Sequence, residues 1–255
     1  MKTKLSTLLA IALLALLPCS LLAQASGNQS FWVHEDVVKP AMVAEYEAVC
    51  KELIGHMKTH NIKDAQWITT NTSDNRYLYV SPIANMADLD KPVFAALAEK
   101  MGQEAMTALF ARMDKCYDVE HDYIINLDTD LSYQPSGINQ TPEGQDYRMF
   151  HYLFVTPGNR AMVREKMKAV KDLFSSKGSK VYYRVYRSGF GTRGEFLMVA
   201  VAAKDAVDHA QMSKANQELF GEDGGKVMWD LFNNLLRYEE YSGMMRPDMA
   251  YTPSN

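Results

Sequence analysis

The chain has 255 residues, with 27 basic and 31 acidic side chains and a formal net charge of −4. This mildly acidic balance argues against nucleic acid and anionic lipid as partners, because both are bound by clustered Lys and Arg.

The first 25 residues have the pattern of a secretory signal peptide. Lys2 and Lys4 precede an apolar run from Leu8 to Leu17, and Ala23-Gln24-Ala25 supplies small residues for a signal peptidase. The run is shorter than the roughly 20 apolar residues that span a membrane, and no later segment approaches that length. We therefore expect Sec-type export to the periplasm or medium and no membrane association after cleavage. Lipid attachment at Cys19 is the alternative, although the preceding Leu-Leu-Pro lacks the small residues usual there.

The first half of the remaining chain is expected to alternate strands and helices. The predicted elements are a strand over 31–35, a helix with an apolar stripe from Val43 to Met57, a hairpin over 65–80 around Ser73-Asp74-Asn75, a helix around 106–113 and a short strand over 119–125. Cys50 and Cys116 fall on helical apolar stripes, so we expect free core cysteines and not a disulfide.

A polar stretch rich in turn formers then separates a second series of elements from the first. This series has a strand over 150–155, a helix from Val163 to Phe174, a hairpin over 181–201 around Gly189 to Gly194, a helix over 227–235 and a closing strand over 238–244.

The two series are related in sequence. Ala41-Met42-Val43 recurs 120 positions later as Ala161-Met162-Val163, and Asp130 to Pro135 is matched by Asp248 to Pro253. Two copies of this length indicate a duplicated domain and not a solenoid. The predicted organisation is a signal peptide (1–25), a first repeat (26–133), a linker (134–145) and a second repeat (146–255).

Each repeat is predicted to be a ferredoxin-like βαββαβ unit, which gives an α+β protein. Such a unit leaves one sheet face bare. Strand alternation is expected to put Trp32, His34, Tyr152 and Phe154 on that face, an aromatic patch too large to leave in water. We therefore expect the two antiparallel sheets to pack against each other as an intramolecular α/β barrel.

On this order of elements and this duplication, the chain resembles the dimeric α/β-barrel superfamily. That group includes antibiotic-biosynthesis monooxygenases, stress-responsive barrel proteins and fused, haem-binding chlorite-dismutase-like enzymes. The resemblance implies a cavity beside the sheets for a small apolar or aromatic ligand. For the haem-binding members it implies an axial histidine in the second repeat, for which His209 is the candidate, with Arg184 or Arg187 as a distal partner.

Aromatic and basic side chains on the predicted inner strands are the candidate ligand-binding residues. Arg184 between Tyr182 and Tyr186 suits an anionic or carbonyl-bearing aromatic ligand, since guanidinium supplies forked donors and the rings supply stacking area. The alternative is that Arg184 pairs with Glu239 or Glu240. The full predicted set is Trp32, Tyr152, Phe154, Tyr182, Arg184 and Tyr186.

Histidines provide the candidates for catalysis and metal binding. A cavity-facing strand histidine, His34 or His151 and also His121, could act as a general base in cofactor-free oxygenase chemistry. His56 and His60, four apart on a helix with Glu52 a turn earlier, could share a metal ion, although histidine is also favoured near a helix C-terminus without one.

Three functions follow from these observations. The first is an exported protein that binds a small apolar or aromatic molecule, with an anionic one included, without a cofactor. The second is an enzyme of the same fold, either a cofactor-independent monooxygenase or a haem protein. The third is a structural protein with a filled core. Because the two units are joined covalently, either a monomer or a homodimer is compatible with the sequence.

Overall fold

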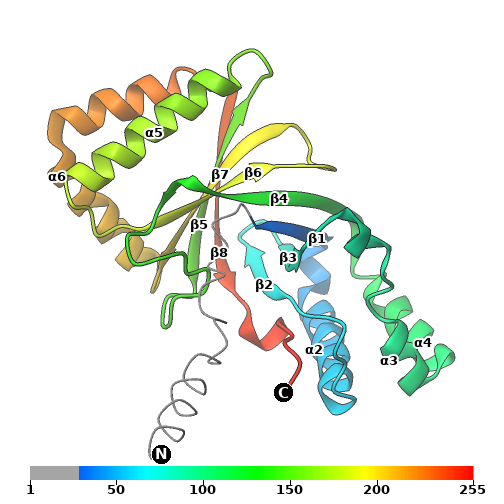
Figure 1. Ribbon diagram of the computed structural model, residues 1–255. Coiled ribbons are helices and arrows are strands. Elements are labelled where there is room, and N and C mark those ends of the chain that lie inside the picture. The colour runs from blue at the N-terminus through cyan, green and yellow to red at the C-terminus, as the bar shows by residue number, and fades with distance from the viewer. Residues whose placement is uncertain (1–28, 255) are drawn as a thin grey trace, which may run out of the picture.

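The computed structural model describes residues 29–254, so the expected signal peptide lies outside the described residues. The strands form a central barrel, and the helices lie in two groups on either side of it (Figure 1). Within residues 29–254, no helix combines the length and the apolar character needed to cross a membrane.

The first half of the chain has the predicted order of strand, helix, hairpin, helix and strand, with one further short helix before the helix predicted around 106–113. Its elements are β1 (Ser30–Val38), α2 (Val43–Thr59), β2 (Ile68–Thr72), β3 (Arg76–Ile83), α3 (Ala95–Met101), α4 (Gln103–Met113) and β4 (Tyr117–Tyr133), with short 3-10 turns at Pro40–Met42 and Met86–Asp90.

The second half repeats this order with one long helix, kinked at Gly221, in place of α3 and α4. Its elements are β5 (Tyr147–Val155), α5 (Arg160–Ser176), β6 (Tyr183–Ser188), β7 (Glu195–Ala203), α6 (Ala206–Phe232), β8 (Arg237–Met245) and a 3-10 turn at Pro247–Met249.

The eight strands close into an antiparallel barrel in the order β1-β3-β2-β8-β5-β7-β6-β4. Each half contributes four consecutive strands, and two seams join the halves. At one seam β2 pairs with β8, for example Thr70 with Met245; at the other β4 pairs with β6, for example Ile125 with Ser188. The predicted α+β fold and intramolecular barrel are thus confirmed.

Each helix layer buries its apolar stripe against the outer face of the barrel. In α2 the buried stripe includes Tyr46, Cys50 and Leu53, as the three-to-four spacing predicts. In α5 Val163 and Met167 occupy the corresponding stripe. Cys50 and Cys116 are both buried and free, and they belong to the first-half core.

A separate apolar cluster fills much of the barrel interior. It includes Phe31 and Val33 of β1 together with Tyr152 and Phe154 of β5. Because side chains alternate along a strand, Trp32 and His34 project to the opposite face of β1, beneath the helices. The expected grouping of Trp32 and His34 with Tyr152 and Phe154 on one face is therefore wrong.

Strand β4 is much longer than the predicted segment 119–125, because it pairs with two different partners. Its first part pairs with β1 and its later part with β6. An irregularity between Asp128 and Tyr133 interrupts the ladder; there the Asp128 carboxylate accepts the Leu131 N–H at 3.1 Å. Strand β4 pairs with β6 on both sides of this irregularity, at Ile125–Asp128 and again at Tyr133.

Gly243 at the β2–β8 seam provides a test of the packing of the two halves. A Cβ atom there would lie 2.5 Å from the Asn71 carbonyl oxygen and 3.3 Å from the Phe150 ring. We expect Gly243→Ala to lower the free energy of unfolding by about 1–3 kcal/mol, because it overpacks the seam. Chemical denaturation measures this change. The matched control is Gly55→Ala at an exposed position of α2, where no atom lies within 4 Å of the added Cβ. Helix propensity predicts that this change stabilises the protein by up to about 1 kcal/mol. Equal effects of the two changes would contradict a tightly packed seam.

Candidate functional site

A cavity of about 470 Å³ lies between the outer face of the first-half sheet and a cover made by α2, α4 and the segment that precedes α3. Most of its wall is apolar or aromatic, and its polar groups come mainly from β1 and β4. The apolar and aromatic lining residues include Leu53, Ile54, Trp67, Tyr79, Val93, Phe94, Phe110 and Met113.

The polar side of this cavity is built by strand register. His34 and Asp36 lie two apart on β1, so they share a face. On β4, Asp122 pairs with His34 and Glu120 pairs with Asp36. The four side chains form a two-by-two grid that lines the cavity.

His34 is held between two carboxylates. Its Nδ1 lies 3.0 Å from Oδ1 of Asp122, and its Nε2 lies 3.3 Å from Oδ1 of Asp36. Asp122 also accepts a 2.8 Å hydrogen bond from the Trp32 indole N–H. The imidazole is therefore fixed in orientation at both nitrogens.

From Asp36 the hydrogen bonds continue into the first-half core. The Tyr46 hydroxyl donates to Asp36 Oδ2 at 2.5 Å and lies 2.7 Å from the Tyr79 hydroxyl, which is 3.3 Å from Sγ of Cys50. Burial raises the pKa of Tyr46 and of Tyr79, and it raises the pKa of Cys50 to about 12. These three groups thus stay neutral near pH 7.

The two carboxylates determine the charge of His34. Burial by itself lowers the pKa of His34, but the hydrogen bonds to Asp122 and Asp36 and their negative charges outweigh this effect and raise it to about 10. The side chain is then an imidazolium at neutral pH. Both of its N–H groups are directed at carboxylates, and it has no free lone pair with which to accept a proton as a general base.

The same grid contains the residues best placed to hold a metal ion in the described part of the chain. His34, Asp36 and Glu120 each offer a ligand atom, and these atoms lie within 4.8 Å of one another. An imidazole nitrogen with carboxylate oxygens suits a divalent ion such as zinc or manganese, which would have to displace the proton on His34. By contrast, the Glu52 carboxylate predicted to assist His56 and His60 accepts a 2.8 Å hydrogen bond from Arg112.

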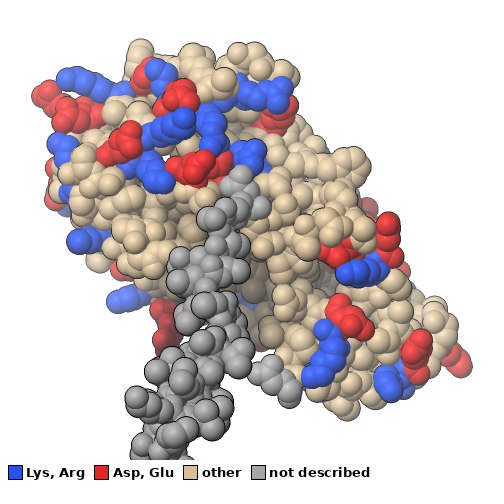
Figure 2. All heavy atoms as spheres, viewed as in Figure 1, with Lys and Arg blue, Asp and Glu red and all other residues tan. Residues whose placement is uncertain are grey.

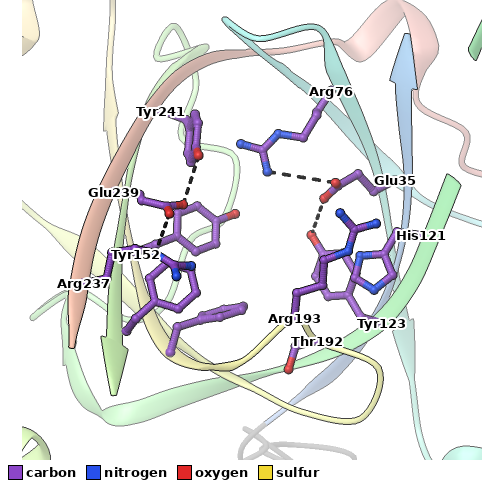
Figure 3. Close-up of a pocket in the computed structure, with 12 residues that line it drawn as sticks. Glu35, Arg76, His121, Tyr123, Tyr152, Thr192, Arg193, Arg237, Glu239 and Tyr241 are labelled. Atoms are coloured by element: carbon purple, nitrogen blue, oxygen red, sulfur yellow. Dashed lines mark hydrogen bonds and ion pairs between the residues drawn. The ribbon is translucent and has the colours of Figure 1, made fainter. Parts of the chain in front are cut away.

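The barrel interior contains a second, smaller cavity of about 200 Å³ near its mouth, where Tyr152 and Phe154 are found (Figure 3). Several charged groups there are paired. Glu35 accepts from the Tyr123 hydroxyl at 3.0 Å, and Glu239 lies 2.6 Å from Arg237, whose guanidinium covers the Phe154 ring at 3.8 Å.

Arg184 and Tyr186 lie deeper in the barrel, whereas Tyr182 precedes β6 and is largely exposed. The alternative pairing of Arg184 with Glu239 or Glu240 is not formed, because Glu239 bonds to Arg237 and Tyr241 and Glu240 to Tyr238. The six predicted ligand-binding residues are therefore divided among different surfaces, and only Trp32 lines the large cavity.

The other two strand histidines are engaged locally. His151 Nδ1 lies 2.7 Å from the Tyr238 hydroxyl, and burial lowers the pKa of His151. His121 Nε2 lies 2.7 Å from the Gly191 carbonyl oxygen at the barrel mouth.

The residues proposed for haem do not form one site. His209 packs against Tyr147 at the start of β5. Arg184 faces the barrel interior, on the other side of the sheet. Arg187 of β6 pairs with Leu197 of β7, which pairs in turn with Leu153 of β5. Leu153 lies six residues along β5 from Tyr147, so Arg187 and His209 are about 20 Å apart along the strand direction. An apolar cluster that includes Phe174 and Phe220 packs between the second-half strands and α5 and α6. The candidate haem residues thus do not fit that cofactor.

Sequence reasoning did not identify Asp36, Asp122 or Glu120 as site residues. The available signal was that His34 and Asp36 lie two apart on one strand, as Glu120 and Asp122 do on another, so that each pair shares a strand face. The register that brings the two pairs together is a tertiary property, which a single strand does not reveal.

The charge of His34 is testable by pH. Because its folded pKa is raised from 6.5 to about 10, its contribution to stability is complete below about pH 6.5 and is lost as the pH rises towards 10. We expect the difference in unfolding free energy between wild type and His34→Gln to shrink between pH 6.5 and 10, and the imidazole to remain protonated at pH 8 by NMR. Asp122→Asn should lower the pH at which half of the His34 imidazole is protonated. A wild-type titration midpoint near pH 6.5 would contradict the assignment.

No family model matches the sequence, and no curated protein is significantly similar to it. Solved structures are similar in fold. An anthrone oxidase-like protein gives a TM-score of 0.54 at 11% identity, covering 87% of this chain and 93% of that one. A proposed monooxygenase from Lactobacillus acidophilus NCFM gives a TM-score of 0.50 at 7% identity, covering 89% of this chain and 97% of that one. A variant of chlorite dismutase from Candidatus Nitrospira defluvii gives a TM-score of 0.50 at 10% identity, covering 88% of this chain and 94% of that one. The chain therefore has the dimeric α/β-barrel fold, closed here within one polypeptide.

Proposed function

We propose that the protein binds a small apolar or aromatic molecule in the cavity between the first-half sheet and its helices. The observation that carries this proposal is the cavity itself, which has a volume of about 470 Å³ and an aromatic wall with polar groups gathered on one side. Small-molecule sites have this size and this combination of apolar wall and few polar groups.

The polar side indicates where the ligand's own polar group would lie. His34 is cationic, and its two N–H groups are directed at the Asp122 and Asp36 carboxylates, which can also accept from a hydroxyl or amine of a ligand. A ligand with an aromatic body and one hydroxyl or amine group matches both parts of the cavity.

Binding is better supported than base catalysis. A cofactor-independent monooxygenase would need a base beside its substrate, and His34, the histidine predicted for that role, is protonated between two carboxylates, which leaves only carboxylates in this cavity as candidate bases. A purely structural role predicts a filled core, which describes the second half better than the first.

Filling the cavity tests the binding proposal. Val93 lines it, so Val93→Trp should occupy its volume and weaken binding of the neutral aromatic probe N-phenyl-1-naphthylamine at least 10-fold, measured by fluorescence titration. Val207→Trp is the matched control, because Val207 is 65% exposed on α6; it should bind the probe as wild type does. No binding by wild type, or equal binding by Val93→Trp, would refute the proposal.

Export is also part of the proposal, supported by the pattern of residues 1–25. Expressed in a Gram-negative host, the protein should be recovered from the periplasm or medium, and N-terminal sequencing should begin at Ser26. Recovery only from the cytoplasm, with Met1 retained, would contradict export.

A further inference from the structure

Two arginines are buried inside the barrel, at the end of β5 away from the mouth described above. Arg148 of β5 and Arg184 of β6 are each 2% exposed. Both pair in register with β7, where they face Ala202 and Ala200 respectively. The short side chain of Ala200 lines a cavity of about 60 Å³ that both arginines also line.

The partners of these guanidinium groups are neutral. Arg148 donates to the carbonyl oxygens of Gln140 and Tyr147, each at 3.0 Å, and to that of Gln145. Arg184 donates to the carbonyl oxygen of Asn139. Within residues 29–254 neither arginine forms an ion pair with a carboxylate, and Nε of Arg184 is buried without a hydrogen-bond partner.

Burying unpaired positive charge is unfavourable, because desolvation is not repaid by an opposite charge. The effect is visible at Arg148, where burial and then repulsion by Arg184 lower the pKa to about 10, although Asp146 opposes this from the surface. A negative ion between the two groups would remove most of that penalty.

We infer that this end of the barrel binds a small monovalent anion between Arg184 and Arg148, independently of the ligand in the helix–sheet cavity. The unpaired Nε of Arg184 supplies a donor, and the Tyr186 hydroxyl, which also lines the cavity and interacts with Arg184, supplies a second. A volume of about 60 Å³ is about that of two water molecules in the liquid, which suits chloride or a formate-sized carboxylate.

The competing explanation is that the arginines only hold the 134–146 segment through its carbonyl groups. In that case the protein would need no anion, and its stability would not distinguish chloride from a bulky anion. The two explanations therefore differ in anion dependence and not in the effect of removing an arginine.

Thermal unfolding at constant ionic strength tests the inference on the intact protein. Replacing 300 mM sodium gluconate by 300 mM sodium chloride should raise the Tm by about 3 °C, since a ligand bound only by the folded state stabilises it. Sodium formate in a third arm distinguishes a carboxylate from a halide. Arg184→Met should abolish the difference, while Arg193→Met, which removes an exposed arginine of the β6–β7 loop, should preserve it.

Crystals of wild-type protein soaked in sodium bromide provide a readout that does not depend on a folded variant. An anomalous peak beside Nε of Arg184 would support the inference. Identical Tm values in chloride, formate and gluconate would overturn it, and so would a bromide-soaked crystal without a peak there if chloride raises the Tm. Neither result bears on binding of N-phenyl-1-naphthylamine in the other cavity, so the two proposals can fail separately.

Discussion

Closure of eight strands into one barrel is the constraint on which the rest of the structure depends. Once β2 pairs with β8 and β4 with β6, no strand is left with an unpaired edge in the barrel, and the shared interior is enclosed by both halves. The inner strand faces are then largely committed to packing Phe31, Phe150 and their neighbours. A large ligand site must therefore lie outside the barrel, where helices cover the strands.

The two helix layers differ, although the order of elements is the same in both halves. In the second half the 27-residue α6 brings Phe220 to within 4.8 Å of Phe174, ring centre to ring centre, and contributes to the filled core there. A glycine interrupts the cover in each half: Gly102, with φ of 88°, ends α3 and begins α4, and Gly221, with φ of 55°, kinks α6. The first-half cavity lies beneath α2, α4 and the segment before α3, beside the grid of His34, Asp36, Asp122 and Glu120.

The fold could be predicted from local patterns, whereas the site could not. Apolar spacing located α2 and α5, and glycines or Ser73-Asp74-Asn75 located the hairpins. The inward face of β1 could not be assigned from the sequence, because a barrel covered by helices places apolar side chains on both faces of its strands. Phe31 packs inside the barrel, whereas the neighbouring Trp32 lines the cavity under the helices. Likewise Arg184 was recognisable as a candidate, but its neutral partner is the carbonyl group of Asn139, whose position depends on tertiary structure.

The three tryptophans allow the central claim, that the ligand site lies under the first-half helices, to be tested by one NMR titration. Trp32 and Trp67 line the cavity, whereas Trp229 is 70% exposed on α6 of the second half. On titration with N-phenyl-1-naphthylamine, the indole N–H resonances of Trp32 and Trp67 should shift while that of Trp229 stays constant. A shift of Trp229 alone, or no shift at any indole, would contradict the account.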